Sequence, residues 1–521
     1  MKPTRTLYAL LLALCSKAPL AWAAAPPSQG LVAFRDEADL KAWLATFQKK
    51  RQDAQRSASV TAGIALAPAP AASPAPSQPA KALESVTVTG SRVEAADSVT
   101  NVQTAGVDEG GIVKTHGDHL VILRRGRLFT VSLKDRLRPV AHADAFGPGL
   151  AGGAWIDEML IHGDTLIVIG FSYARGGTEI GLFDIGRDGR IAYRDTYHLR
   201  SNDYYSSRNY ASRLVDGKLV FYAPLMLGYA ADPWSQLPAL RRWGRGTGAG
   251  TPAPFKPIAP ATRIYRSGDE IAPHELTLHS VTTCDLSQRD MSCESTGVLA
   301  PSGRVFYVSA TSVYVWTGSR GSRRSAPGAA SALFRMPLDG AAPTGIRTSG
   351  GQPIDQFSFL EDAGGHLNVF LQGFARGDGM WSAEFGEPGG AAHLLRVPLS
   401  AFSARMDPAP DTAFRRLPAA NGGAVQNRFV GDYLLYGTGN TWWRAEARLA
   451  HALHAVRYAA NDPAQTIALP HGVDRIEAMG THAVVIGTAG KDLLFSSVAL
   501  QREASIPFRF TQPDAAQGET R

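Results

Sequence analysis

Residues 100–133 read TNVQTAGVDEGGIVKTHGDHLVILRRGRLFTVSL, and their second half contains a pattern that recurs through the rest of the chain. In this pattern an apolar pair leads into a turn that holds glycine, and a run of Leu, Val, Ile and aromatic residues follows, as in a hairpin of β-strands. Each copy is followed by a second such run, for example RLFTVSL at 127–133. The copies occupy residues 112–123, 159–171, 213–224, 298–309, 359–371, 428–438 and 477–488.

The turn glycines of successive copies lie 46 to 86 residues apart. A propeller blade has four antiparallel strands and takes about 40–50 residues. The shorter separations therefore fit one blade each, and the longer ones contain loops rich in Gly, Pro, Ser or Arg at 225–262, 317–330 and 373–391. The turn glycines are Gly117, Gly163, Gly217, Gly303, Gly365, Gly431 and Gly480.

These repeats predict an all-β fold, a β-propeller of seven four-stranded blades, preceded by a short helix and an Ala/Pro linker. One sheet leaves its apolar faces bare, whereas seven sheets around an axis cover one another and protect their edges. A stacked sandwich is the alternative, and the periodic glycine turn favours the propeller. We expect ASIPFRF (504–510) to form a strand of the seventh blade, and ESVTVTGSRV (84–93) or the segment at Thr100 to complete that blade.

The composition is that of a globular protein. The chain has 521 residues, of which 44% are apolar and 19% charged. Its 53 glycines and 33 prolines suit many short strands joined by turns. Beyond the N-terminus no apolar run reaches the length of a membrane span.

The N-terminus has the pattern of a signal peptide, which we place at residues 1–25. Two basic residues precede the apolar run 7–15, and AWA at 21–23 offers small residues to a signal peptidase. Cys15 raises the alternative of lipoprotein processing, but the residue before it is not small. We therefore expect a periplasmic or secreted protein. Cleavage lowers the formal net charge from +7 to +4, which is too mild to indicate a nucleic-acid partner.

The mature chain divides into four segments. We expect an amphipathic helix within 26–60, where Leu40, Leu44 and Phe47 recur at helical spacing, to dock on the main domain. Residues 84–93 also resemble a short segment near the mature N-terminus of TonB-dependent outer-membrane receptors, which makes outer-membrane association an alternative. After the helix come an Ala/Pro linker at 61–83, the propeller at 84–511 and a disordered tail at 512–521.

Two cysteines remain after export, Cys284 and Cys293, and they lie nine residues apart. In an oxidising compartment they most simply form a disulfide. A metal-binding pair is the weaker alternative, because two cysteines cannot complete a tetrahedral site.

The opening stretch TNVQTAGVDEGGIVKTHGDHL (100–120) resembles the signature of a family of bacterial secreted β-propellers described as distantly related to WD40 repeats. That signature reads approximately TNVQ, a variable pair and GVDEADIVKTDG. The chain matches TNVQ, GVDE, IVKT and Gly117, whereas Gly110-Gly111 replaces Ala-Asp and His116 replaces Asp. Weaker similarity covers most of residues 31–500. The resemblance implies an exported propeller, and it implies no activity because the family is functionally uncharacterised.

No familiar catalytic, cofactor or metal motif stands in the sequence, so the catalytic residues are unknown and we expect no cofactor or metal. GFSYA at 170–174 lacks the second glycine of a nucleophile elbow. HELTLH (274–279) is one residue too long for the metalloprotease motif and is expected in a strand. His451 and His454 fit one helical turn, but no third ligand is evident.

The first half of the opening stretch occurs only once, so it is where we expect a special site or a clasp that closes the ring. Asp108 and Glu109 are adjacent acids beside a glycine pair and Lys114, which suits a charge network that fixes the first blade. A cation or ligand site at the mouth of the ring is the alternative. The candidate residues are Asn101, Gln103, Asp108, Glu109 and Lys114.

Two loops place aromatic residues beside arginine, SNDYYSSRNY (201–210) and DPWSQLPALRRWGR (232–245). Such residues favour binding, including binding to anionic sugars, although ordinary connecting loops are the simpler interpretation. We expect a binding scaffold of the cell envelope that holds a protein or an envelope glycan at one loop face of the propeller. The alternative is a hydrolase or lyase that acts on an envelope or extracellular polymer in the funnel of the ring, so enzyme activity stays open.

Overall fold

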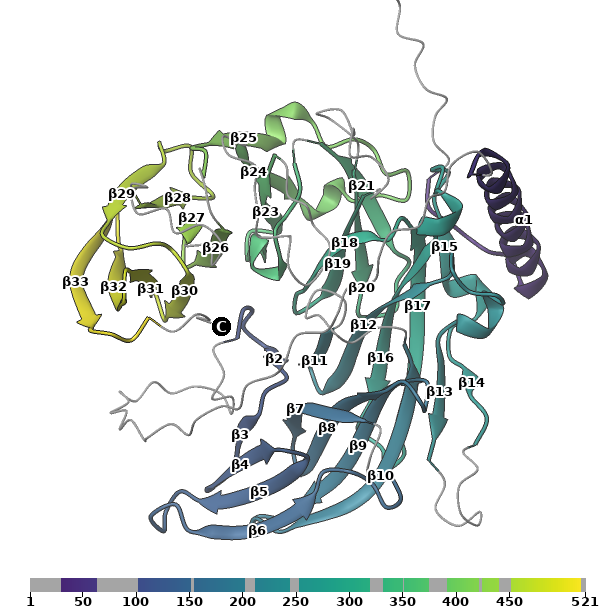
Figure 1. The fold of residues 1–521 in the computed structure, drawn as a ribbon, viewed down its shortest axis with the longest axis horizontal. Helices are drawn as coiled ribbons and strands as arrows, with labels where there is room; N and C mark the ends of the chain where they lie inside the picture. Colours follow the sequence, from purple (N-terminus) through teal and green to yellow (C-terminus); the bar gives the residue numbers. More distant parts are fainter. Residues whose placement is uncertain are drawn as a thin grey trace, which may run out of the picture.

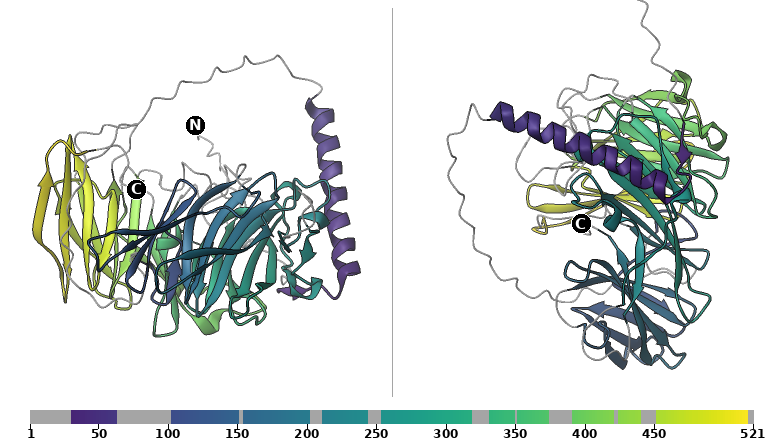
Figure 2. Two further views of the ribbon diagram at one scale, coloured as in Figure 1. Left: turned by 90° about the horizontal axis from the view of Figure 1, so that it is seen from below. Right: turned by 90° about the vertical axis from the view of Figure 1, so that its right-hand side faces the viewer.

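The computed structural model describes residues 30–62, 102–150, 154–201, 211–243, 253–318, 331–349, 351–373, 391–420, 424–439 and 451–516. Seven β-sheets follow one another around a common centre, which confirms the predicted propeller (Figure 1). Seen from the side, the sheets form one flat layer, and helix α1 (Glu37–Ala62) stands at its rim (Figure 2).

Five blades have the predicted four strands, and each is built from one continuous stretch of chain. Blade 1 contains β3 (Val113–His116), β4 (His119–Arg124), β5 (Arg127–Ser132) and β6 (Pro139–Asp144). Blade 4 contains β18 (Gly303–Val308), β19 (Ser312–Gly318), β20 (Ser331–Pro337) and β21 (Thr344–Thr348). Blade 5 contains β22 (Phe359–Glu361), β23 (His366–Gln372), β24 (Ala392–Pro398) and β25 (Phe414–Leu417). Blade 6 contains β26 (Ala424–Val430), β27 (Tyr433–Gly439), β28 (His451–Arg457) and β29 (Gln465–Leu469). Blade 7 contains β30 (Arg475–Met479), β31 (His482–Ala489), β32 (Asp492–Leu500) and β33 (Ala504–Gln512).

Blades 2 and 3 carry additional strands at their edges. Blade 2 consists of β7 (Trp155–His162), β8 (Thr165–Ser172), β9 (Gly177–Ile185) and β10 (Ile191–Arg200), extended outward by β13 (Ala239–Arg242) and β14 (Lys256–Pro257). Blade 3 consists of β11 (Ala211–Val215), β12 (Lys218–Met226), β16 (Thr277–Asp285) and β17 (Ser292–Ala300). Its inner edge gains β2 (Val107–Glu109), and its outer edge gains β15 (Ile264–Arg266) and β1 (Val32–Ala33). The stretch 225–262, predicted to be a loop, therefore contributes two strands.

Short 3-10 turns connect several of these strands. They are η1 (Trp234–Gln236), η2 (Ala261–Arg263), η3 (Pro273–Glu275), η4 (Gln356–Ser358), η5 (Leu399–Ala401) and η6 (Asp411–Ala413).

Hydrophobic clusters between successive blades hold the ring together. Alternating apolar residues on each strand face the next sheet, and six clusters each join one blade to its neighbour, from blades 1 and 2 through to blades 6 and 7. Phe221 and Leu435 are fully buried in two of them. Burial of one such side chain contributes about 1.5–3 kcal/mol to the free energy of unfolding.

The seam between blades 1 and 7 differs from the other six. Among the described residues, no hydrophobic cluster contains side chains from both of these blades. Phe508 and Phe510 on β33 are 64% and 49% exposed. The last strand of the chain therefore leaves aromatic surface uncovered at the end of the ring.

Helix α1 packs on blade 3, as the expectation of a docked helix requires. Leu40 and Leu44 are buried in a cluster with Leu225, Leu278 and Leu299 from the blade-3 sheet. Arg51 reaches from the helix to donate hydrogen bonds to two backbone carbonyls in the chain that follows β12. No described helix is both long and apolar enough to cross a membrane.

Three local predictions need correction or confirmation. β33 belongs to blade 7 as expected, but the segment after Thr100 does not complete that blade, because β2 pairs with β11 of blade 3. Gly303 does not turn a hairpin, because it starts β18 after the link from blade 3. The disulfide is confirmed: Cys284 and Cys293 face each other across β16 and β17 and are bonded.

The signal peptide, the residues 84–93 and most of the linker lie outside the described residues.

Buried histidines predict a loss of stability in acid. His279 on β16 is fully buried between the Tyr222 hydroxyl and the Pro301 carbonyl, each 2.9 Å from a ring nitrogen. Burial, and after it the nearby guanidinium of Arg304, lower the pKa of His279 to about 3. Burial also lowers the pKa of His454 and His471.

An unfolded histidine takes up its proton near pH 6.5, so below that pH the unfolded chain binds more protons than the folded one. The free energy of unfolding should therefore fall as the pH drops from 6.5 toward 3, by about 2 kcal/mol at pH 5 from His279 alone. Urea unfolding at pH 7, 6 and 5 measures this change in the free energy of unfolding. His279→Gln should flatten the slope, whereas exposed His142→Gln should not. An unfolding free energy that is equal at pH 7 and pH 5 contradicts the prediction.

Candidate binding sites

The unrepeated segment before blade 1 runs along the inner edges of several blades. β2 pairs with β11, the innermost of the repeated strands of blade 3, and Val107 is buried there. Gln103 donates from its amide nitrogen to the carbonyls of Gln356 and Phe359 in blade 5, at 2.6 and 3.2 Å. The Thr104 hydroxyl lies 3.0 Å from that of Tyr307 in blade 4. The segment therefore contacts three blades before it enters the first one.

Lys114 connects this segment to blade 1. Its side chain is almost fully buried at the start of β3, and its Nζ lies 2.6 Å from both Asp108 Oδ1 and the Glu109 carbonyl. Burying an ammonium group is unfavourable unless a carboxylate and hydrogen bonds replace its water. Lys114 therefore fixes the turn between β2 and β3 at one geometry.

Glu109 continues the charge network across the centre. Its carboxylate lies 3.8 Å from Arg213 Nε, and Arg213 also donates to the Gln356 side chain at 2.9 Å. Next to it, Arg428 of blade 6 pairs with Glu477 of blade 7 at 3.2 Å. Burial lowers the pKa of Arg428, while the carboxylates of Glu477 and Glu109 oppose that shift. Charges from several blades are thus matched at the centre of the ring.

Gly110 marks the departure of this chain from the family signature, where alanine is usual. A Cβ on Gly110 would lie within 3 Å of the Glu158 carboxylate from blade 2, which also accepts a hydrogen bond from Ser212. An alanine would therefore force that carboxylate away. Gly111 next to it forms a bridge with Met159 of blade 2. Gly110 therefore allows the chain to pass close to blade 2.

The structure brings four of the five candidate residues together, namely Gln103, Asp108, Glu109 and Lys114, whereas Asn101 lies outside the described residues. Among the described residues, no group of three or more His, Cys, Asp or Glu is arranged to hold a metal ion. Sequence reasoning missed Arg213, Tyr307 and Gln356. Arg213 opens the third repeat, so its position next to β2 follows only from the pairing of non-adjacent strands.

The histidine pairs do not form the geometry considered from the sequence. His279 lies on β16, but His274 lies in η3, so only the second half of HELTLH is a strand. His451 and His454 lie on strand β28 instead of a helical turn, so their side chains point to opposite faces.

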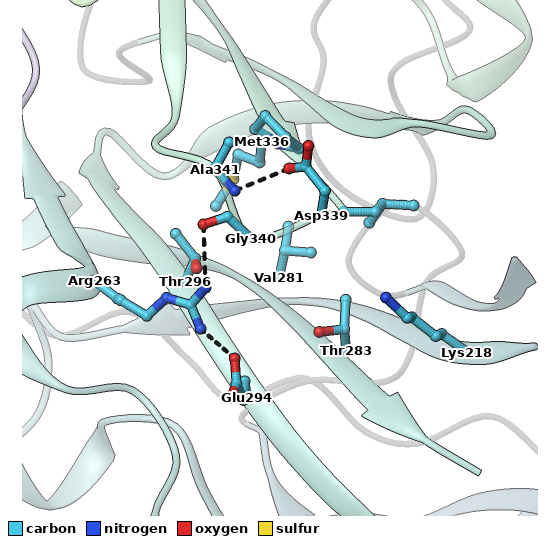
Figure 3. Close-up of a pocket in the computed structure, with 12 residues that line it drawn as sticks. Lys218, Arg263, Val281, Thr283, Glu294, Thr296, Met336, Asp339, Gly340 and Ala341 are labelled. Atoms are coloured by element: carbon cyan, nitrogen blue, oxygen red, sulfur yellow. Dashed lines mark hydrogen bonds and ion pairs between the residues drawn. The ribbon is translucent and has the colours of Figure 1, made fainter. Parts of the chain in front are cut away.

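A small polar pocket of about 100 Å³ lies between blade 3 and the turn that joins β20 to β21 (Figure 3). Arg263 spans it, with Nη1 2.5 Å from Glu294 and Nη2 donating to the Gly340 carbonyl at 3.1 Å. Lys218 and Thr283 line the opposite part. The Arg263 guanidinium is already bound by Glu294 and the Gly340 carbonyl. It therefore links blade 3 to blade 4.

A second group of arginines lies at one end of blade 2. Glu179, His198 and Arg241 occupy one row across β9, β10 and β13. The Glu179 carboxylate lies 2.9 Å from Arg175 Nε and 3.2 Å from His198 Nε2. One carboxylate in this row is therefore shared by a guanidinium and an imidazole.

Arg200 and Arg241 stack on Phe255, the residue just before β14. Their guanidinium carbons lie 4.6 and 4.4 Å from the centre of its ring. Arg200 donates to the Leu237 carbonyl at 2.9 Å, and Arg241 donates to the Arg175 carbonyl at 2.6 Å. Neither forms an ion pair with a carboxylate of the described residues. Burial lowers the pKa of each, and a neighbouring arginine lowers it further.

These arginines lie in or directly beside the two aromatic loops that the sequence singled out. Arg241 lies within 232–245, and Arg200 immediately precedes 201–210. Trp243 from the first loop also packs edge-on against His198, with ring centres 5.4 Å apart. Most of the second loop lies outside the described residues.

The buried Lys114–Asp108 pair predicts a large effect of a small substitution. Asp108→Asn removes the carboxylate beside a buried ammonium group, which should lower the free energy of unfolding by about 3 kcal/mol. The matched control is Asp118→Asn, because Lys134 and Asp118 also lie 2.6 Å apart but are 75% and 57% exposed. This control should change the free energy by less than about 1 kcal/mol.

Thermal and urea unfolding of both variants, with and without added divalent ions, measure these effects. Equal stability of Asp108→Asn and the parent would contradict the structural role of the pair. A rise in the melting temperature of the parent with divalent ions would instead support a cation site.

Comparison with solved structures finds similarity at low identity and low TM-score. The chain has low similarity to the solved structure of Hsv2 from Kluyveromyces lactis with loop 6CD replaced by a Gly-Ser linker, with 8% identity over 77% of this chain and 99% of that chain, at a TM-score of 0.32. The acylaminoacyl peptidase of Pyrococcus horikoshii is 8% identical over 76% of this chain and 52% of that chain, at a TM-score of 0.32. AztD from Citrobacter koseri is 10% identical over 73% and 91%, at a TM-score of 0.28. These values are too low to transfer any function.

No curated protein matches the chain. The model of the β-propeller domain family matches residues 97–389, which is more than half of the chain and includes the opening signature. The match starts just before the central segment and runs into blade 5. The chain therefore belongs to the β-propeller domain family.

Proposed function

We propose that this protein is an exported binding scaffold of the cell envelope, with its ligand site on the arginine-rich end of blade 2. The observation that carries the proposal is the pair Arg200 and Arg241, which are partly buried and stack on Phe255 without a carboxylate partner among the described residues. Arginines that lose water without gaining an anion are costly to the free protein, and a bound anion would relieve that cost.

The charge pairing at the centre of the ring favours a binding function at the periphery over catalysis in the funnel. Three of the acids near the centre, Asp108, Glu109 and Glu477, each lie beside a lysine or arginine of the same chain. Such pairs stabilise a scaffold, whereas a general acid or base needs a group free to exchange a proton with a substrate.

Export is part of the proposal. The N-terminal pattern of basic, apolar and small residues supports it. The disulfide between Cys284 and Cys293 is also typical of proteins that fold outside the reducing cytosol. N-terminal sequencing of the mature protein should find a start at Ala24 or Pro26, and a start at Met1 would contradict export.

Affinity capture tests the binding function. The mature protein is immobilised and exposed to an envelope extract, and a column of the same protein denatured before coupling serves as the control. We expect the folded protein to retain one class of component, which elutes as the salt concentration is raised. Calorimetry should then show that the eluted component binds to the purified protein in solution. Retention that is equal on both columns contradicts the proposal. Shortening of an extracted polymer during the incubation would support the hydrolase or lyase instead.

A further inference from the structure

We propose that the end of blade 2 at the turn between β8 and β9 binds an acidic polysaccharide, with arginines that hold its carboxylates and exposed aromatic rings that hold its sugar faces. This inference rests on the proposed binding function and names its ligand class.

Phe255 organises the charged part of the site. Its ring lies over the β8–β9 turn, where a Cβ added to Gly176 would meet it at 3.6 Å. Arg200 and Arg241 both stack on this ring, so the two guanidinium groups are held near each other although they come from different strands. Planar guanidinium groups bind carboxylates in a two-pronged geometry, and rings that fix them reduce the entropy lost on binding.

The balance of charge favours an anion. Arg175, Arg200 and Arg241 supply three positive charges, and Glu179 is the carboxylate found beside them among the described residues. Glu179 is already engaged by Arg175 and His198. In addition, Arg241 Nε is buried without a hydrogen-bond partner among the described residues. A buried donor with no acceptor is rare in folded proteins.

Two aromatic side chains on the same end of the blade point to a sugar. Trp155 and Tyr173 are 50% and 54% exposed, and their rings stand perpendicular with centres 5.7 Å apart. Tyr173 lies in the same turn as Arg175, so the aromatic pair is next to the arginines along the blade. The electron-rich faces of such exposed rings suit the C–H groups of a sugar ring. An acidic sugar chain would supply carboxylates for the arginines and sugar faces for the two aromatic rings.

Isothermal titration calorimetry of the full mature protein tests the inference with three probes of equal length: tetragalacturonate, neutral maltotetraose and tetraglutamate. We expect tetragalacturonate to bind, with affinity that falls as salt is raised, and the other two to bind at least roughly tenfold more weakly. Arg200→Gln and Arg241→Gln should each weaken tetragalacturonate binding roughly tenfold. Phe255→Leu should also weaken it, because the guanidinium groups lose their common support.

The matched control is Arg187→Gln, which makes the same charge change at an exposed position in the turn between β9 and β10, at the opposite end of blade 2. Arg187→Gln should bind as the parent does, and circular dichroism melting should show that all variants fold. Equal binding by Arg200→Gln and the parent overturns the site. Tighter binding of tetraglutamate than of tetragalacturonate overturns the ligand class. If no sugar binds but affinity capture retains another component, the inference fails while the scaffold function stands.

Discussion

The interaction between Lys114 and the turn before it is the one on which the centre of the structure depends. A buried ammonium group is bound by the Asp108 carboxylate and the Glu109 carbonyl, both 2.6 Å away. This contact joins the repeated part of the chain to the part that occurs once. It places β2 against blade 3 and Gln103 against blade 5, so that blade 1 is tied to blades on the far side of the ring. The unrepeated half of the opening signature is therefore a structural segment at the centre of the propeller.

The arrangement also accounts for how the ring is held together. Propellers in which one terminus adds a strand to the blade of the other close through backbone hydrogen bonds. Here blade 7 takes all four strands from the C-terminal end of the chain, and the described residues show no shared hydrophobic cluster between blades 7 and 1. The central segment contributes contacts across the ring that the seam does not supply. Arg428 and Glu477 extend the same network to blades 6 and 7.

The sequence predicted the fold well because the repeat is a physical unit. Alternating apolar residues and a turn glycine are what a four-stranded sheet between two others requires, and six of the seven glycines do adopt positive φ. Gly303 misled the interpretation because a link between two blades can look like a hairpin turn. The strands β13 and β14 were missed because Pro, Gly and Arg dominate 225–262. The stacking of Arg200 and Arg241 on Phe255 could not be predicted. It depends on the register in which β13 pairs with β10 and with β14.

The blade-2 surface shows how edge strands add side chains to a propeller blade without altering its core. β13 and β14 extend the sheet beyond its fourth strand, and they supply Arg241 and the position of Phe255. The Trp155–Tyr173 pair comes from strand β7 and from the turn after β8 in the same blade. Loops and edge strands can vary while the hydrophobic clusters between blades stay the same, which is how propellers and other rigid scaffolds carry different functions.

The central claim is that residues 102–114 are an integral part of the ring, and amide hydrogen exchange of the full chain tests it most directly. The amides of β2 that pair with β11 should exchange as slowly as those of β11, because they would be released only when the ring itself opens. Asp108→Asn should speed the exchange of both strands together. Rapid exchange of these β2 amides in the parent protein, with β11 still protected, would contradict the account.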